Sequence, residues 1–161
     1  MNEHPSPPLD AVDLRLLALL QADCTLTNQA LAERAGVSPA TALRRVKALV
    51  QAGVIERQVA VLNPAHFAPG LTALVEVTLD RQGAEWLAAF EQHAVAFAEV
   101  QQCYRVSPGP DFVLVLQAAD MPAYLALSQR LFTSQANVRN VKAFFSTHRA
   151  KFHPQLPLPT A

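Results

Sequence analysis

The sequence predicts an α+β protein in which three short helices are followed by a domain of the order β-α-β-β-α-β. Residues 9–61 carry apolar side chains at three- and four-residue spacing, which is typical of helices. Residues 71–151 instead alternate β-branched runs with helical patterns. Between them, residues 62–70 (LNPAHFAPG) hold two prolines and a glycine, which predicts a linker. The ends are expected to be a disordered N-terminus at 1–8 and a flexible tail at 152–161.

The first helix is expected at residues 10–22. Asp10 and Asp13 lie in its first turn, where carboxylates interact favourably with the positive end of the helix dipole. The apolar residues that mark this helix are Leu9, Val12, Leu16, Leu17, Leu19 and Leu20.

A second, shorter helix is expected to begin after Thr27, whose hydroxyl makes it a suitable N-cap. Gly36 follows this helix and is the residue best able to bend there. Only two residues separate Gly36 from Pro39, which is the length of a helix-turn-helix turn. The inward side chains of the second helix would be Ala30, Leu31 and Ala35.

The third helix is expected at residues 39–52, with Ser38 as N-cap, Pro39 in the first helical position and Gly53 in the left-handed conformation at its end. Its apolar face would consist of Leu43, Val46, Leu49 and Val50. Its outward face would consist of Thr41, Arg44, Arg45, Lys47 and Gln51.

After the third helix, a strand or wing is predicted from the β-prone Val54, Ile55, Val59 and Val61. A capped helix with one apolar and one basic face suits a DNA major groove, so we expect residues 39–52 to bind there.

Charge indicates a local DNA-binding patch rather than a global one. The chain has 13 basic and 13 acidic residues, so it has no overall positive field. Residues 34–57, however, carry five basic side chains and a single acidic one, Glu56. We therefore expect DNA binding to be strongly salt-dependent and to need more than one copy of the module.

Composition points to a cytoplasmic protein without a cofactor. No apolar run approaches the 18 or so residues of a membrane span, and no secretory leader is present. Cys24 and Cys103 lie in unrelated segments, so reduced thiols are expected; a disulfide between them has no support. The chain shows no Ser-His-Asp pattern, glycine-rich phosphate loop or CxxC, so catalytic residues and metal ligands are not expected.

The second half predicts four strands and two helices. The strands are expected at 71–79, 99–106, 112–118 and 138–146. The helices are expected at 84–98, facing inward with Trp86, Leu87, Phe90, Val95 and Phe97, and at 121–132, facing inward with Tyr124, Leu125, Leu127, Ser128 and Leu131. This order is the ferredoxin-like arrangement, an antiparallel sheet with both helices on one face. The other face would lack a cover within the chain, and a second copy is the simplest partner.

Several motifs together resemble the Lrp/AsnC family of transcriptional regulators, over nearly everything from Leu9 to Lys151. They are LTNQALAERAGVS (26–38), LRRVKALVQAGVI (43–55), AVLNP (60–64), the Asp111-Phe112 strand entry and the Asp120-Met121-Pro122-Ala123-Tyr124 helix start. The resemblance implies a winged helix-turn-helix domain joined to an ACT-like ligand-sensing domain. It also implies double-stranded DNA as a partner, a homodimer that assembles into tetramers or octamers, and a small effector, usually an amino acid, in crevices between sensing domains.

Carried over by position, the resemblance also implies which residues form the two sites. The DNA-binding surface would be Ser38, Thr41, Arg44, Arg45 and Lys47. The effector crevice would be Ser107, Gly109, Asp111, Phe112, Thr133, Ser134, Phe144, Phe145 and Ser146. Arginine can take guanine bidentately, whereas Ser38 and Lys47 are better suited to phosphate. Asp111 either receives the ammonium group of an effector or merely caps its turn.

Three positions depart from the family pattern. Pro108 stands where glycine is usual, Thr25 where an arginine is common, and Gln58 where an aromatic residue is usual. These departures affect three features that the resemblance implies. They are the shape of the crevice loop, one phosphate or packing contact, and the start of the wing.

Two alternatives to a DNA-binding regulator stay open. Sirohaem decarboxylases resemble this family, but their chemistry would need positioned acids, typically histidines. None of the chain's histidines falls in such a constellation, and His148 near the last strand is the one to watch: His4, His66, His93, His148 and His153. A partner subunit that does not bind DNA is favoured slightly by Thr25 but disfavoured more by Arg44 and Arg45.

Overall fold

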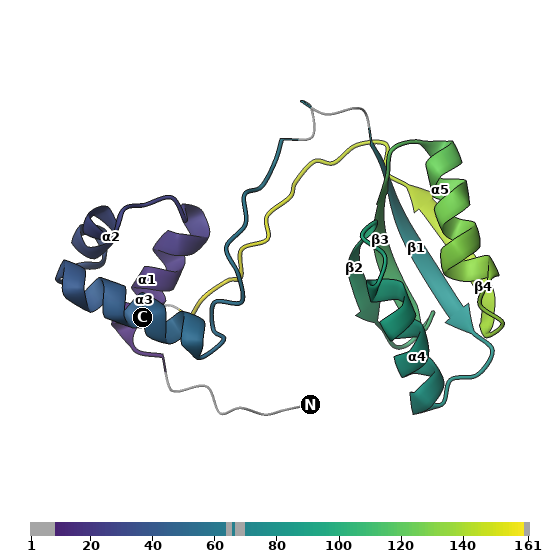
Figure 1. The fold of residues 1–161 in the computed structure, drawn as a ribbon, viewed down its shortest axis with the longest axis horizontal. Coiled ribbons are helices and arrows are strands. Elements are labelled where there is room, and N and C mark those ends of the chain that lie inside the picture. Colours follow the sequence, from purple (N-terminus) through teal and green to yellow (C-terminus); the bar gives the residue numbers. More distant parts are fainter. Residues whose placement is uncertain (1–8, 64–65, 67–69, 160–161) are drawn as a thin grey trace. The chain divides into compact units, whose positions relative to one another are not determined.

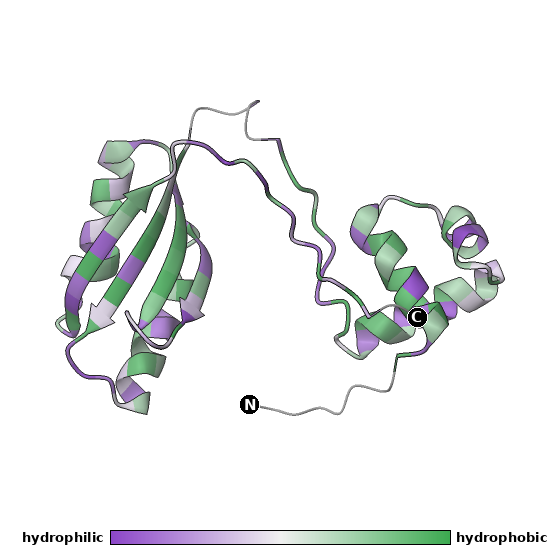
Figure 2. Cartoon of the chain, turned by 180° about the vertical axis from the view of Figure 1, so that it is seen from behind, coloured by the Kyte–Doolittle hydropathy of each residue, from purple (hydrophilic) through white to green (hydrophobic). Residues whose placement is uncertain are grey.

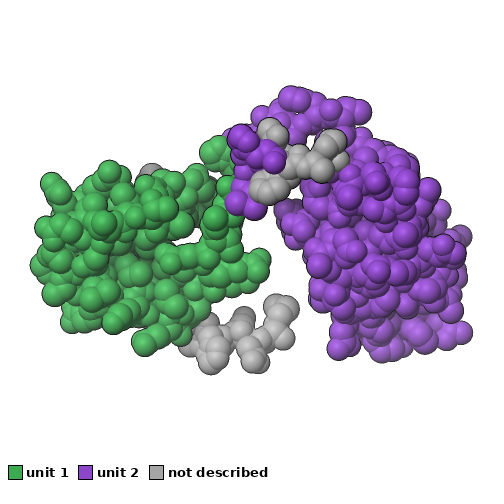
Figure 3. All heavy atoms as spheres, turned by 45° about the horizontal axis from the view of Figure 1, so that its top comes forward, with its two compact units in different colours: residues 1–61, 152–161 green, residues 62–151 purple. Residues whose placement is uncertain are grey.

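The computed structural model describes residues 9–63, 66 and 70–159. It divides into two compact units, the first made of residues 1–61 and 152–161 and the second of residues 62–151 (Figure 3). The expected disordered N-terminus, residues 1–8, lies outside the described residues. Within the described residues, no helix is long and apolar enough to cross a membrane.

The first unit contains three helices, α1 (Ala11–Ala22), α2 (Asn28–Ala35) and α3 (Pro39–Gln51) (Figure 1). Each N-cap side chain accepts backbone N–H groups of its own first turn: Asp10, Thr27 and Ser38. The sequence predicted the caps at Thr27 and Ser38, whereas it placed Asp10 inside the first turn. Gly36, with φ +71°, and Gly53, with φ +72°, confirm the two predicted left-handed positions. The small core of this unit consists of Leu16, Leu31, Ala32, Ala35 and Ala42.

Two expectations about the first unit are wrong. Residues 54–63 contain no strand, although a strand or wing was predicted there. Val59 and Val61 are 61% and 63% exposed, so this segment has no buried apolar face to hold it in a ribbon. In α3, the predicted inward residues Leu43 and Val50 are also exposed, whereas Val46 and Leu49 face inward as predicted and Ala42 joins them.

The second unit is a four-stranded antiparallel sheet in the order β2-β3-β1-β4. Its elements are β1 (Leu71–Leu79), α4 (Ala84–Val95), β2 (Val100–Arg105), β3 (Phe112–Ala118), α5 (Met121–Ser128), a π-helical turn η2 (Gln129–Thr133) and β4 (Val138–Phe145). Figure 1 shows α4 and α5 over the same face of the sheet, as the ferredoxin-like prediction requires. Strands and helices share one apolar core, visible as green along the strands in Figure 2.

Side chains of the second unit follow the predicted pattern except at a few helical positions. Leu125 and Val95 were expected inside but are exposed, and Trp86 is partly exposed. The continuation of α5 differs as well, since the N–H of Ser134 donates to the carbonyl of Gln129 at 3.0 Å. This wider turn belongs to η2, in which both Leu131 and Phe132 are buried.

Residues 152–159, part of the segment that the sequence predicts as a flexible tail, contact the first unit in the structure. Residues 152–159 have no regular secondary structure, yet they belong to the first unit. The backbone N–H of Leu156 donates to Oε1 of Gln21 at 2.7 Å, and Nε2 of Gln155 donates to the carbonyl of Gln21 at 2.8 Å. The last turn of α1 thus binds a segment some 135 positions away in the sequence.

Candidate DNA-binding and effector sites

The outward face of α3 carries two exposed cations, Arg44 and Lys47, one turn apart. Gln51 continues the same face at the end of the helix and is also exposed. Among the described residues, neither Arg44 nor Lys47 has an ion-pair partner. Both charges therefore face solvent and are available to an anionic ligand.

Ser38 and Thr41 lie at the N-terminal end of the same helix. The Ser38 Oγ accepts the backbone N–H of Thr41 at 3.2 Å, and the two hydroxyls are 2.9 Å apart. Unpaired N–H groups and the positive end of the helix dipole make such an end a suitable site for a phosphate. Asn28 joins this end to α2, because its Nδ2 donates to the carbonyl of Pro39 at 2.9 Å.

Arg45 lies differently from its neighbour Arg44. Its Nη1 donates to Oδ2 of Asp10 at 2.6 Å and to Oδ1 of Asp13 at 3.0 Å, and its side chain is only 28% exposed. Those two carboxylates also form the capping box that opens α1. Arg45 thus joins α3 to the first turn of α1 instead of facing outward, as the sequence had led us to expect.

The charges in this cluster stabilise one another. Hydrogen bonds from the backbone of Asp13 and from the guanidinium of Arg45 lower the pKa of the Asp10 carboxyl below its ordinary value of 3.8. The same bonds from Arg45 to Asp10 and Asp13 raise the pKa of the guanidinium. Near neutral pH, Arg45 and Asp10 are therefore both charged.

A second arginine, Arg15, joins α1 to the turn of the motif. Its Nε donates to the carbonyl of Ala35 at 3.1 Å, in the last turn of α2. The bond stabilises the negative end of that helix, immediately before Gly36. Sequence reasoning missed the roles of both Arg15 and Asn28, because each contact joins two helices and leaves no local pattern.

The residues predicted for the effector crevice fall into two groups at opposite ends of the sheet. Ser107 to Phe112 lie in the β2–β3 turn beside the end of β1, where Phe112 pairs with Val77. Thr133 and Ser134 lead into β4 at that same end, where Val138 pairs with Leu79.

Phe144 and Phe145 instead pair with Leu74 and Ala73 at the beginning of β1. Ser146 follows them, donating its N–H to the carbonyl of Thr72. Along β1, the partner of Phe112 is Val77 and that of Phe144 is Leu74, so the nearest members of the two groups are three residues of strand apart, or about 10 Å.

Asp111 is engaged with its own chain. Its Oδ2 accepts the backbone N–H of Leu79 at 2.7 Å and the side-chain amide of Gln82 at 3.2 Å. Its carboxylate therefore binds the end of β1. This structural role resembles the turn cap, the second of the two roles that the sequence left open for Asp111. The adjoining turn contains a cis peptide bond between Ser107 and Pro108 and has Gly109 at φ +122°, a backbone conformation that favours glycine.

Phe144 and Phe145 lie on opposite faces of the sheet, because successive side chains of a strand alternate. Phe145 contacts the Tyr124 ring edge-on, at 5.0 Å between centroids, on the face that the helices cover. Phe144 lies on the uncovered face, next to the ammonium of Lys142. The two rings therefore do not line one pocket, contrary to the sequence expectation.

The uncovered face of the sheet is apolar at its centre. Leu74, Tyr104 and Phe144 are 43%, 53% and 45% exposed there, and Val113 and Val115 are half-buried between them. Polar residues also lie on this face, including Glu76 opposite Lys142. A continuous apolar area of this kind on a sheet is typical of a protein–protein interface.

Among the described residues, no group of three histidine, cysteine, aspartate or glutamate side chains is placed to hold a metal ion. His148 is exposed, and its carbonyl accepts the Ser146 hydroxyl at 3.4 Å. Cys24 and Cys103 are both free thiols.

Comparison with known proteins matches each unit to a described domain. Residues 9–56 match the winged helix-turn-helix DNA-binding model, and residues 72–156 match the Lrp/AsnC ligand binding domain. The DNA-binding transcriptional activator DecR of Escherichia coli is 34% identical over 150 residues, covering 93% of this chain and 99% of DecR.

Two solved structures are similar over nearly their whole length. An AsnC family transcriptional regulator from Agrobacterium tumefaciens has a TM-score of 0.84 at 32% identity, covering 92% of this chain and 97% of its own. A transcriptional regulator from Neisseria meningitidis, crystallised as a complex with L-Met, has a TM-score of 0.84 at 29% identity, covering 93% and 97%.

Proposed function

The chain belongs to the Lrp/AsnC family of DNA-binding transcriptional regulators, and from this premise we propose how its own residues divide the work of DNA binding and effector binding. DNA binding falls to the outward face of α3, with Arg44 reading base edges and Lys47 holding a phosphate. Ser38 and Thr41 hold a second phosphate at the N-terminal end of the helix. The observation that carries this proposal is that Arg44 and Lys47 face solvent without an ion-pair partner in the described part of the chain.

Arg45 has a different task in this proposal. Because it is bound to Asp10 and Asp13, it sets the angle of α3 against α1 and acts on DNA only through that placement. It is therefore a positioning residue rather than a base-reading one.

A gel shift on the DNA upstream of the protein's own gene, over a salt series, tests this division. We expect Arg44→Ala to weaken specific binding by about 1–3 kcal/mol, the value of one bidentate base contact. Lys47→Ala should weaken binding to all sequences alike and lower the salt slope by about one. Equal losses on specific and unrelated DNA for Arg44→Ala would show that Arg44 holds a phosphate and does not read a base.

The second unit binds the effector, which we propose to be an amino acid, as the L-Met complex of the Neisseria meningitidis relative suggests. We place it at the end of the sheet where the β2–β3 turn and the start of β4 meet β1. The residues there would be Ser107, Gly109, Asp111, Phe112, Thr133 and Ser134. Phe144, Phe145 and Ser146 lie toward the other end of β4, and we propose that any part they have comes from another copy.

Asp111 provides the sharpest test of this site. Asp111→Asn keeps an oxygen that can accept the N–H of Leu79 but removes the negative charge. If the carboxylate receives the effector's ammonium group, this variant should lose its response to a panel of the twenty amino acids, while DNA binding without effector stays normal. An unchanged response would leave Asp111 with its structural role alone, and the effector would have to bind elsewhere.

A homodimer completes the proposal, with the uncovered sheet face of each copy against the other and further assembly to tetramers or octamers. The protein would act in the cytoplasm, where its DNA lies. The apolar centre of that face supports a second copy as its cover. Sedimentation of Phe144→Asp should show a shift toward monomer, whereas Phe152→Asp, outside this face, should sediment as the unchanged chain does.

A further inference from the structure

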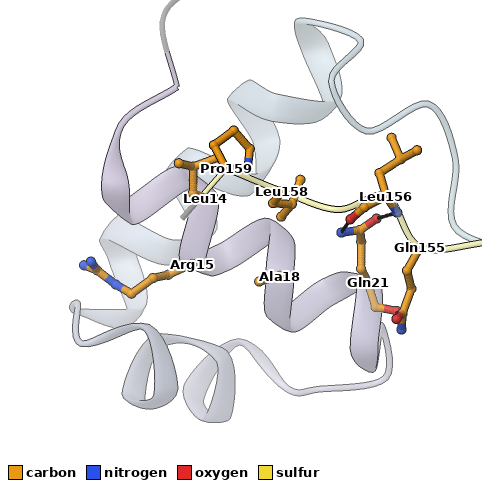
Figure 4. Close-up of a pocket in the computed structure, with 8 residues that line it drawn as sticks. All are labelled: Leu14, Arg15, Ala18, Gln21, Gln155, Leu156, Leu158 and Pro159. Atoms are coloured by element: carbon orange, nitrogen blue, oxygen red, sulfur yellow. Dashed lines mark hydrogen bonds between the residues drawn. The ribbon is translucent and has the colours of Figure 1, made fainter. Parts of the chain in front are cut away.

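The C-terminal segment Gln155–Pro159 lies along α1 and runs in the opposite direction to the helix (Figure 4). Pro159 lies next to Leu14 near the beginning of α1, and Leu156 lies next to Gln21 near its end. The Gln21 side chain binds the backbone of Leu156 twice, donating to its carbonyl at 3.2 Å and accepting its N–H at 2.7 Å. A side-chain amide used in this way imitates the pairing of a neighbouring strand.

The face of α1 beneath this segment is apolar at its centre. Leu14, Ala18 and Gln21 follow each other at four- and three-residue spacing and so form one stripe, away from the core residue Leu16. Between this stripe and the segment lies an open hollow of about 400 Å³, with Leu158 half-buried beside it. A helix with apolar residues on two faces needs a cover on each, and the C-terminal segment covers the second in part: Leu14 and Leu158 are half-buried, while Ala18 and Leu156 stay exposed.

The sequence of the segment suits this contact. Pro154, Pro157 and Pro159 restrict φ and favour an extended chain before it is bound, which lowers the entropy lost on binding. Proline has no N–H, so extended proline-rich chains leave few donors to satisfy. Leu156, between two of the prolines, retains its N–H and gives it to Gln21.

We propose that Leu14, Ala18 and Gln21 form a docking site for residues 155–159 of the same chain, and that the docked segment is a strap between the two units. β4 of the second unit ends at Phe145, and the chain reaches the docking site ten residues later. Together with residues 62–70, the strap gives the DNA-binding unit a second connection to the ligand-binding unit. Two connections restrict the relative displacement of two bodies much more than one flexible linker does.

Amide hydrogen exchange tests the docking. In Gln21→Ala and in Leu158→Asp we expect the amides in the second half of α1 to exchange about threefold to tenfold faster than in the unchanged chain. Gln29→Ala in α2 is the matched control, since Gln29 is exposed, makes no hydrogen bond with a described side chain and gains the same helix propensity. Exchange in β1 and β3 serves as the internal standard for global unfolding. Equal exchange in α1 for all three variants would overturn the proposal.

Distance measurements between spin labels test the strap. One label goes on the native Cys24, which is exposed in the first unit, and one on Gln92→Cys on the exposed side of α4, in a Cys103→Ser chain. Labelled chains are mixed with excess unlabelled chain, so that each distance is measured within one copy. We expect the distance distribution to broaden in Gln21→Ala and in a chain ending at Phe152, but not in Gln29→Ala. An unchanged distribution in the shortened chain would show that the segment does not act as a strap within one copy.

Discussion

The two units of this protein are stabilised in different ways. The ligand-binding unit has a large apolar core in which two strands, β1 and β3, and both helices bury leucine, valine and aromatic side chains. The core of the DNA-binding unit is far smaller, and three of its five fully buried members are alanines. Polar contacts between segments accompany this small core: the Arg45 cluster, the Arg15 bond to Ala35 and the Gln21 bonds to the C-terminal segment. The comparison teaches that single polar residues matter more in the first unit than in the second.

The largest effect is expected from a core deletion in the ligand-binding unit. Phe112 is fully buried and contacts the Phe90 ring at 4.8 Å between centroids. Phe112→Ala should therefore lower the free energy of unfolding by about 3–5 kcal/mol, through lost transfer free energy and the remaining cavity. Urea unfolding followed by circular dichroism measures it. A loss below about 1 kcal/mol would mean that the core refills the space, and the contrast between the units would weaken.

The two neighbouring arginines should differ in which property their removal changes, and the effect on stability should be smaller than that of Phe112→Ala. Arg45→Ala removes the partner of two carboxylates and should lower the thermal midpoint of the DNA-binding unit slightly, by far less than Phe112→Ala does. Arg44→Ala should leave that midpoint unchanged while weakening DNA binding. Differential scanning calorimetry and gel shift on both variants would distinguish the two roles. If Arg45→Ala lost DNA affinity with an unchanged midpoint, Arg45 would be a DNA contact after all.

Acid should weaken the first unit through Asp10. Because the pKa of Asp10 is lower in the folded protein than its ordinary value of 3.8, its contribution is fully present above that value. The contribution is lost as the pH falls from 3.8 through the lower folded pKa, when the carboxyl gains a proton. Asp10→Asn should thus destabilise the chain at pH 6 but bring little further change at pH 3. A variant that differed equally from the parent at both pH values would assign the effect to the helix cap alone.

The smallest expected effect concerns the two thiols. Burial raises the pKa of the Cys103 thiol, so less of it is thiolate at neutral pH, whereas Cys24 is exposed. Iodoacetamide should therefore modify Cys24 several times faster than Cys103, as peptide mass spectrometry would show. Equal rates in the native protein would indicate that β2 opens readily at the edge of the sheet.

The amino-acid sequence by itself determined the local features of both units. The helix caps at Thr27 and Ser38, the bend at Gly36 and the order of strands and helices depend on residues a few positions apart. For this reason spacing alone predicted them. The family resemblance rests on the same local motifs, and the comparisons confirm it.

Only the tertiary structure decided which residues are available to ligands. Arg44 and Arg45 are adjacent and chemically identical, yet Arg45 is bound by Asp10 from another helix. The register of β4 against β1 decides that Phe145 rather than Phe144 faces the helices, and the C-terminal segment binds α1 from the far end of the sequence. Each of these outcomes depends on contacts between segments that are distant in sequence. No local spacing encodes such contacts, which is why the first unit's polar connections and the division of the effector residues appear only once the chain is folded.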